Sequence, residues 1–368
     1  HLIFVVKIKI IMKVCILGDG LTSLTLAKTL VNQGIYVDIF LKKKTKHHDK
    51  SRTLGISKSN IDFFNKNILN IEKLLWNINK IEIYSENLKD EKILNFQNKE
   101  KQLFSIVKNH ELNNRLMINL KKSKFVKFKK EINLRILIKK DYKLIFNCDL
   151  KNSITKKFFH KKIDKNYDSH AYTTIIKHKK FIRNDVAIQI FTERGPLAFL
   201  PISETETSVV YSARGKKNFS LEKLISKYNN RYKIIKINEV ATFELSSSNL
   251  RCYYHKNIMA FGDLLHKLHP LAGQGFNMSI RDIKEIHNLV NFKLDHGMDL
   301  DNSICLNFEK KIKHKNYLFS NSVDFVYEFF NLESNIKNKF LSKSIKLIGR
   351  NKFINNFFTK FADNGMVI

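Results

Sequence analysis

The sequence is poor in residues that interrupt or cross-link a chain. Its 368 residues include only 3 prolines and 12 glycines, which argues against a long disordered linker. The 4 cysteines are scattered and no Cys-x-x-Cys arrangement occurs, so no disulfide framework is indicated. We therefore expect the cysteines to be reduced core residues of a cytoplasmic protein.

Long apolar runs are also missing. No run approaches the ~18–20 residues that a membrane-spanning helix needs, and Leu2–Val6 is too short for a signal-peptide core. We therefore do not expect the chain to cross a membrane. The chain begins with His1, and the first regular pattern starts at Met12, so we expect residues 1–11 to lie upstream of the natural start.

Acidic residues are scarce beside basic ones. There are 66 Lys and Arg against 34 Asp and Glu, a formal net charge of +32, which often marks a nucleic-acid binder. The lysines, however, fall in many separate segments and trace no single stripe. We interpret them as a compositional bias that accompanies abundant Ile, Asn and Phe, and predict no nucleic-acid partner. Attraction to anionic lipid headgroups is the alternative, which leaves open peripheral contact with the inner face of the membrane.

Residues 13–40 have the pattern of a strand, a tight turn, a helix and a second strand, the length of a dinucleotide-binding unit. The turn has the sequence Gly-Asp-Gly-Leu-Thr-Ser. Gly18 permits the sharp turn, Gly20 lets the backbone approach a pyrophosphate, and Ser23 replaces a third glycine where packing needs a small residue. A turn without a ligand is the alternative.

One expected feature of that unit is absent. An acidic residue should follow the second strand and hold the adenosine ribose, but Leu41 stands there, followed by Lys42–Lys44. The loss of one such hydrogen bond costs ~1.5–3 kcal/mol, which weakens dinucleotide binding without abolishing it.

Residues 262–282 carry the most informative pattern. The apolar run Ile258–Phe261 predicts a buried strand that ends at Gly262–Asp263, and residues 273–275, Gly-Gln-Gly, open an apolar-periodic helix. A helix N-terminus built from glycines exposes unpaired N–H groups, which suit an anionic or electron-rich ligand. A glycine-rich turn with a solvated aspartate is the alternative.

This stretch resembles the second FAD-binding motif of class A flavoprotein monooxygenases, and the ubiquinone-biosynthesis hydroxylases fit best. Leu264 and Leu265 replace two alanines, while the matching positions are Asp263, His266, Pro270, Gly273, Gln274, Gly275 and Asn277. The resemblance implies that Asp263 hydrogen-bonds the ribityl chain of FAD. It also implies that the backbone of residues 273–277 lies against the flavin ring.

Three further segments resemble the same family. Residues 51–57 match the segment with an arginine near the FAD phosphates, which makes Arg52 the candidate; a solvated surface arginine is the alternative. Residues 144–156 correspond to the fingerprint Asp-Gly-x-x-Ser-x-x-Arg, with Asp149 and Ser153 kept but Leu150 and Lys156 replacing the glycine and the arginine. Leucine resists a positive φ and lysine lacks the arginine fork, which affects nicotinamide handling more than FAD binding. Residues 195–201 resemble a substrate-domain strand over the flavin.

The cofactor residues implied in this way are Gly18, Gly20, Ser23, Arg52, Asp149, Asp263, Pro270, Gly273, Gln274, Gly275, Phe276 and Asn277. We assign no catalytic side chain and no metal ligand. His266 and His269 are expected to be structural hydrogen-bonding residues.

The resemblance covers nearly the whole chain and implies an α/β fold: a discontinuous Rossmann-like FAD-binding domain, an inserted mostly antiparallel substrate domain, and C-terminal helices. We assign 12–60, 105–158 and 255–292 to the FAD-binding domain, 61–104 and 159–254 to the substrate domain, and 293–368 to the C-terminal helical region. Residues 323–330 and 345–358 have helical apolar spacing, which is typical of core. A basic amphipathic helix resting on a bilayer is the alternative.

The implied reaction is hydroxylation of an aromatic ring, with FAD as the cofactor and NAD(P)H as a transient co-substrate. By resemblance, the substrate is a polyprenylated phenol of ubiquinone biosynthesis. No second Gly-x-Gly unit exists for NAD(P)H, which fits transient binding. Two alternatives remain: a flavin-dependent reductase of the same fold, and a non-catalytic homologue in a biosynthetic complex.

Overall fold

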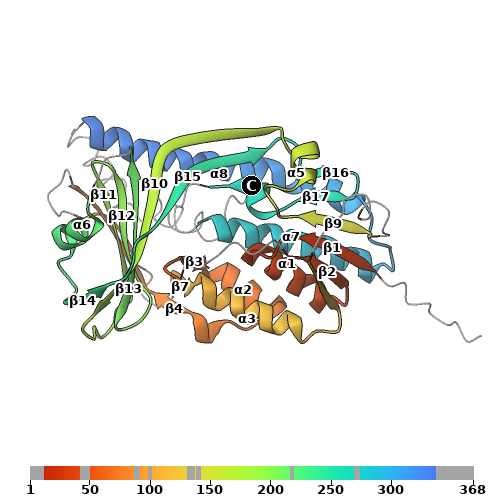
Figure 1. Ribbon diagram of the computed structural model, residues 1–368, viewed down its shortest axis with the longest axis horizontal. Coiled ribbons are helices and arrows are strands. Elements are labelled where there is room, and N and C mark those ends of the chain that lie inside the picture. Colours follow the sequence, from red (N-terminus) through yellow and green to blue (C-terminus); the bar gives the residue numbers. More distant parts are fainter. Residues whose placement is uncertain are drawn as a thin grey trace, which may run out of the picture.

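The computed structural model describes residues 12–41, 50–86, 92–97, 102–130, 137, 142–215, 219–268 and 274–336. In this part of the chain, a mainly parallel sheet and a long mainly antiparallel sheet lie at opposite ends of the molecule (Figure 1). The longest strands, β10 (Lys162–His178) and β15 (Ala241–Leu250), extend between the two ends, and the long helix α8 (Ser303–Ile336) runs beside them.

The parallel sheet is built from short apolar runs that are buried on both faces, as parallel strands require. Its strands, in spatial order, are β16 (Tyr254–His255), β17 (Ile258–Ala260), β9 (Leu144–Asn147), β1 (Lys13–Leu17), β2 (Tyr36–Phe40) and β8 (Val126–Lys129). All pairs are parallel except β16 with β17. From β8 to β17 this is the order of a dinucleotide-binding sheet, in which ligands bind beyond the carboxyl ends of the strands.

The carboxyl ends of four of these strands are tied together by main-chain hydrogen bonds. Cys148 N donates to Leu17 O at 2.9 Å, Gly18 N to Phe40 O at 3.0 Å, and Phe261 N to Asn147 O at 2.9 Å. The loops that follow β1, β9 and β17 therefore begin side by side at one edge of the sheet.

The second sheet has nine strands among the described residues and is antiparallel except where β11 meets β5. Its order is β18 (His266–Lys267), β15 (Ala241–Leu250), β10 (Lys162–His178), β13 (Glu206–Arg214), β12 (Gly195–Pro201), β11 (Val186–Thr192), β5 (Lys80–Ser85) and β6 (Lys92–Gln97), with β14 (Ile234–Ile237) also paired to β10. Its core includes Leu197, Val209, Tyr211 and Ile225, so one face of the sheet is covered by α6.

A small sheet and the helices complete the described fold. The small sheet contains β3 (Thr53–Ser57), β7 (Phe104–Lys108) and β4 (Trp76–Ile78). The α-helices are α1 (Leu21–Asn32), α2 (Lys58–Asn67), α3 (Asn109–Lys121), α5 (Ser153–Phe158), α6 (Leu221–Tyr228), α7 (Gln274–Asp295) and α8 (Ser303–Ile336), and the 3-10 turns are η1 (Glu72–Leu74) and η3 (Gly262–Leu264). Apolar residues of α1, α2, α3 and α7 share one large core with the parallel sheet.

The predicted fold class is confirmed: a Rossmann-like sheet and a mostly antiparallel sheet are both present, with helices after them. Strand β17 and helix α7 begin where the sequence placed them. The domain boundaries stay a prediction, and residues 345–358 lie outside the described residues. Among the described residues, no helix combines the length and hydropathy that crossing a bilayer requires.

The expectation for the cysteines is partly wrong. All four are thiols outside any disulfide, but only Cys15 and Cys305 are buried, whereas Cys148 is half-buried and Cys252 is exposed. Cys252 follows the end of β15 in a short connection to β16, where the chain leaves the core. Scattered spacing excludes a framework of disulfides, but it carries no information about the burial of a single residue.

Candidate cofactor site

The early glycine turn, residues 18–23, has the conformation that the sequence predicts. Gly18 has a φ of +113°, and a Cβ added to it would lie 3.4 Å from Ser23 Oγ and 3.6 Å from Cys148 Cβ. Gly20 precedes α1 and faces open space, because an added Cβ would meet no atom within 4 Å. No side chain caps α1 and no acidic residue lies in its first turn, so its first N–H groups and positive dipole end are available to an anion.

The late glycine turn, which starts at Gly262 and includes η3, lies directly against the early one. Gly262 has a φ of +64°, and an added Cβ would lie 3.1 Å from Thr22 Cγ2 in the first turn of α1. Because of this close approach, η3 and its Asp263 sit beside the N-terminus of α1. Asp263 is exposed although its neighbours Gly262 and Leu264 are buried, so its carboxylate is accessible at the place where the two turns meet.

Helix α7 begins at Gln274, so it contains residues 274–277 of the segment that the resemblance places at the flavin. Gly275 faces open space, since an added Cβ would have no neighbour within 4 Å. Gln274 Oε1 is a buried acceptor without a hydrogen-bond donor among the described residues. Phe276 packs into the large core. Pro270 and Gly273, also predicted to bind the cofactor, lie outside the described residues.

Asn277 has a role that sequence reasoning missed. Its side-chain oxygen accepts hydrogen bonds from Ser57 N and Asn60 Nδ2, both at 2.9 Å, and its Nδ2 donates to Gly55 O at 2.8 Å. The side chain is 2% exposed by residue and is committed to β3 and α2. Asn277 therefore fixes the start of α7 in place.

Arg52 and Asp149 lie on loops, and they differ in how their side chains are held. Arg52 is exposed and its main-chain oxygen accepts a hydrogen bond from Asn109 N, which anchors β3 while leaving the side chain in solvent. Asp149 Oδ1 accepts a hydrogen bond from Lys151 N at 2.9 Å. This carboxylate therefore stabilises its own turn.

Leu150 fits its turn without the glycine conformation. The non-glycine residues with positive φ in the described chain are Asp168, Arg183 and Lys256, so Leu150 is not among them. Asn147, Asn152 and Thr155 organise the turn instead: Asn152 Nδ2 donates to Asn147 Oδ1 at 2.7 Å and Asn152 caps α5 through Thr155 N at 2.8 Å. The substitution therefore leaves this loop unstrained.

The missing ribose acid is not replaced by the nearest carboxylate. Asp38, three residues before Leu41, is buried within β2 and pairs with Lys13 at 3.0 Å and with Lys129. Burial alone would raise the pKa of Asp38, but hydrogen bonds from Lys129, Tyr142 and Lys13 outweigh it and lower the pKa. Asp38 is thus fully engaged inside the sheet.

These residues fit the adenine-dinucleotide half and the flavin end of FAD. An uncapped helix start and the open face of Gly20 suit a pyrophosphate, Asp263 supplies an acceptor for hydroxyl groups, and the start of α7 supplies N–H groups. The structure brings together Gly18, Gly20, Ser23, Asp263 and the segment after Cys148. Thr22, Asn60 and the contacts of Asn277 were missed, because each depends on residues far apart in sequence.

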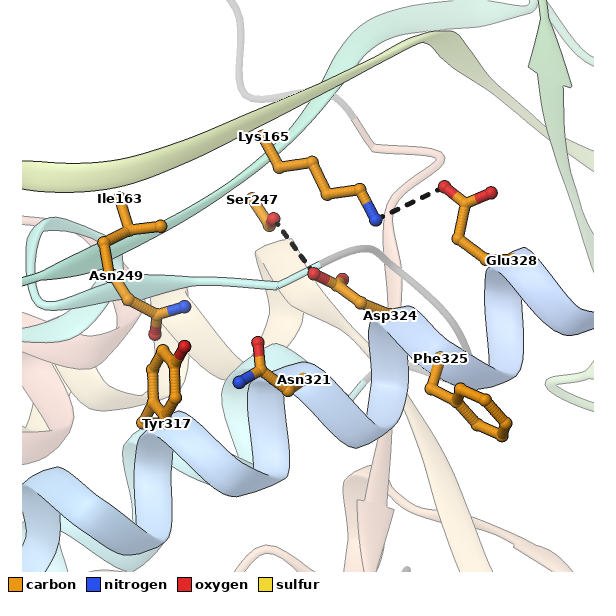
Figure 2. A pocket seen from close by; sticks show the side chains of 9 residues that line it. All are labelled: Ile163, Lys165, Ser247, Asn249, Tyr317, Asn321, Asp324, Phe325 and Glu328. Atoms are coloured by element: carbon orange, nitrogen blue, oxygen red, sulfur yellow. Dashed lines mark hydrogen bonds and ion pairs between the residues drawn. The ribbon is translucent and has the colours of Figure 1, made fainter.

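A separate hollow lies along α8. Figure 2 shows it between β10, β15 and α8, with Ser247 bonded to Asp324 and Lys165 paired with Glu328. The hollow measures about 340 Å³ and is lined by Ile163, Lys165, Ser247, Asn249, Tyr317, Asn321, Asp324, Phe325 and Glu328. None of the sequence-predicted cofactor residues lines it, so its chemistry is distinct from that of the glycine turns.

Comparison with solved structures identifies the class of fold. The structure of p-nitrophenol 4-monooxygenase from Pseudomonas putida matches with a TM-score of 0.76 at 11% identity, covering 97% of this chain and 99% of that one. The Klebsiella pneumoniae protein HpxO, solved with FAD and uric acid, matches with a TM-score of 0.72 at 11% identity, covering 95% and 97%. The chain therefore has the fold of the FAD-dependent monooxygenases. No protein-family model matches it.

Sequence relatives narrow the resemblance. The mitochondrial ubiquinone biosynthesis monooxygenase COQ6 of Schizosaccharomyces pombe is 24% identical over 274 residues, 61% of this chain and 57% of that protein. The human protein of the same name is 26% identical over 178 residues, covering 37% and 38%. The chain spans little more than half of the first relative and less of the second. The resemblance to class A flavin monooxygenases, with the ubiquinone-biosynthesis group as the best fit, is confirmed.

Proposed function

We propose that the protein is an FAD-dependent monooxygenase that hydroxylates an aromatic ring in ubiquinone biosynthesis, with NAD(P)H and O₂ as co-substrates. The observation that supports this most is the close approach of Gly262 to Thr22: a Cβ added to Gly262 would lie 3.1 Å from Thr22 Cγ2. This approach brings the two halves of one dinucleotide site together. The COQ6 relatives, which are named ubiquinone biosynthesis monooxygenases, support the pathway. A phenolic lipid as the substrate is part of the proposal.

The chain's own residues have defined tasks in this proposal. The N–H groups of α1 would bind the pyrophosphate, Asp263 would bind the ribityl hydroxyls, and Arg52 would bind the phosphates. The first N–H groups of α7 stabilise negative charge on the flavin end. Bound FAD supplies the redox chemistry: two electrons from NAD(P)H reduce O₂, so that one oxygen atom enters the ring and the other leaves as water.

The membrane and the biosynthetic partners belong to the same proposal. A formal charge of +32 favours contact with anionic headgroups, which would place the enzyme where a polyprenylated phenol is dissolved. A flavin-dependent reductase remains the second candidate, because the same site would hold FAD in either case. The third candidate is a non-catalytic homologue, because Leu41, Leu150 and Lys156 differ from the residues that the family pattern has at these positions.

The test begins with purified protein and FAD. Quenching of FAD fluorescence gives the dissociation constant, and NAD(P)H oxidation with a polyprenylated phenol under ¹⁸O₂ shows whether one labelled oxygen enters the product. Binding together with label incorporation supports the hydroxylase. NAD(P)H oxidation without label in the product favours the reductase, whereas failure to bind FAD at any concentration contradicts the proposal.

A further inference from the structure

A buried polar chain links three elements behind the late glycine turn. His266 in β18 donates a hydrogen bond through Nε2 to Asp282 Oδ2 in α7. Asn316 in α8 donates through Nδ2 to Asp282 Oδ1 at 3.1 Å. The side chains of His266 and Asp282 are each only 1% exposed, so the contact lies entirely inside the protein.

His266 and Asn316 each bond one oxygen of Asp282, whereas His266 Nδ1 has no hydrogen-bond partner among the described residues. A carboxylate carries no hydrogen, so His266 must donate from Nε2, and Asn316 must present its amide nitrogen to the other oxygen. A buried carboxylate without such donors would be strongly unfavourable. Removal of either donor therefore leaves one buried oxygen of Asp282 without its hydrogen bond, and the surrounding apolar groups cannot replace that bond.

These hydrogen bonds also connect the two segments that we propose to hold the cofactor. His266 lies three residues after Asp263, and Asp282 lies eight residues after Gln274, which is about 12 Å along α7. The bond between them connects the strand before residues 269–273 to the helix that follows those residues. Asn277 holds α7 on a different side, through β3 and α2.

We propose that His266, Asp282 and Asn316 are positioning residues that fix the axial position of α7, and with it the N–H groups of residues 274–277, relative to Asp263. This inference rests on the proposed function, because those N–H groups act on the flavin. A displacement of α7 lengthens hydrogen bonds that are effective only over a short range. It therefore weakens FAD binding and lowers the flavin reduction potential, since negative charge on the reduced form loses its stabilising donors.

Two variants of one residue separate this role from general stability. His266→Ala removes the donor, whereas His266→Gln keeps an N–H at a comparable distance from the main chain. The matched control is His178→Ala, because His178 is equally buried at 2% exposure. Its ring nitrogens contact Lys179 O and Thr207 Oγ1, and neither of these partners belongs to α7.

The measurements are FAD affinity, flavin reduction potential, and hydrogen exchange of α7 in the FAD-free protein. We expect His266→Ala to bind FAD ~10- to 100-fold more weakly, to show a lower potential, and to exchange α7 amides faster. His266→Gln should lie near the wild type in all three. His178→Ala should lower the urea midpoint while leaving FAD affinity, potential and α7 exchange unchanged.

Several outcomes would overturn the inference. Wild-type values for His266→Ala would do so, and so would equal changes in His178→Ala, since these would indicate general loosening. If His266→Ala does not fold, Asn316→Ala replaces it, because that variant removes the second donor and keeps the His–Asp pair. Wild-type protein that binds no FAD would contradict the proposed function itself, whereas normal binding in every variant would contradict only the positioning role.

Discussion

The contact between the two glycine turns can be tested with Gly262→Ala. The alanine would have to adopt a φ of +64° and place its Cβ 3.1 Å from Thr22 Cγ2 and 3.3 Å from Thr22 Cβ. Gly297 provides the matched control, since it has a φ of +66° but no atom within 4 Å of an added Cβ. The two substitutions thus share the backbone strain, and only the first has the steric contact.

The expected magnitudes follow from these two contributions. A left-handed conformation costs a non-glycine residue roughly 1–2 kcal/mol, and overpacking against a fixed neighbour costs about 1–3 kcal/mol more. Gly297→Ala should therefore lower the free energy of unfolding by about 1–2 kcal/mol and Gly262→Ala by about 2–5 kcal/mol. Thr22→Ser in the Gly262→Ala background removes the nearest carbon and should recover part of the difference.

Urea unfolding gives the free energies, and fluorescence titration gives FAD affinity for the same proteins. We expect only Gly262→Ala to weaken FAD binding, because it forces Asp263 away from the N-terminus of α1. The reasoning is refuted if the two alanine variants have equal stability and equal FAD affinity, or if Thr22→Ser recovers nothing.

Three other variants test neighbouring parts of the argument. Asn277→Ala removes the side-chain hydrogen bonds to Ser57 N and Gly55 O and should cost about 2–4 kcal/mol of stability in urea; a cost below about 0.5 kcal/mol would contradict the geometry. Asp263→Ala should weaken FAD binding roughly 10- to 150-fold, the cost of one hydrogen bond to a charged group, with Asp19→Ala, in the early turn, as the comparison that retains wild-type affinity. Glu82→Gln tests acid stability: burial alone would raise the pKa of Glu82, but hydrogen bonds from Lys80, Lys92 and Tyr84 lower it to about 2. A lowered pKa stabilises the folded state above the unfolded value near 4.5, so the stability difference between wild type and Glu82→Gln should be constant above about pH 5 and shrink between pH 4.5 and 2; a difference that does not change over this range would be inconsistent with the ion pairs.

The features that could be read from the sequence are those with short-range causes. Gly18 and Gly262 mark turns because each needs a positive φ, and the strand β17 and helix α7 follow from local apolar spacing. The order of the motifs along the chain then implied the fold. These patterns need only a few neighbouring residues, so they are visible before any tertiary contact is known.

The contacts that build the site could not be predicted in this way. Asn277 lies 220 residues from Ser57, yet it is bonded to that residue's main chain. The proximity of Thr22 to Gly262 and of His266 to Asp282 and Asn316 likewise depends on how separate elements pack. Cys252 was wrongly expected in the core for the same reason: burial is a property of the packed chain, and one residue type does not determine it.

The strand order of the parallel sheet affects how the protein folds while the ribosome synthesises it. Its strand β17 comes from residues 258–260, whereas its partner β9 comes from residues 144–147 and β1 from residues 13–17. At ~5–20 residues per second, the ribosome needs several seconds or more to deliver β17 after β9 has emerged. During that interval β9 has an unpaired edge, which is a hazard for aggregation. Nascent chains stalled before Ile258 should therefore depend on chaperones, and chains released after α7 should not.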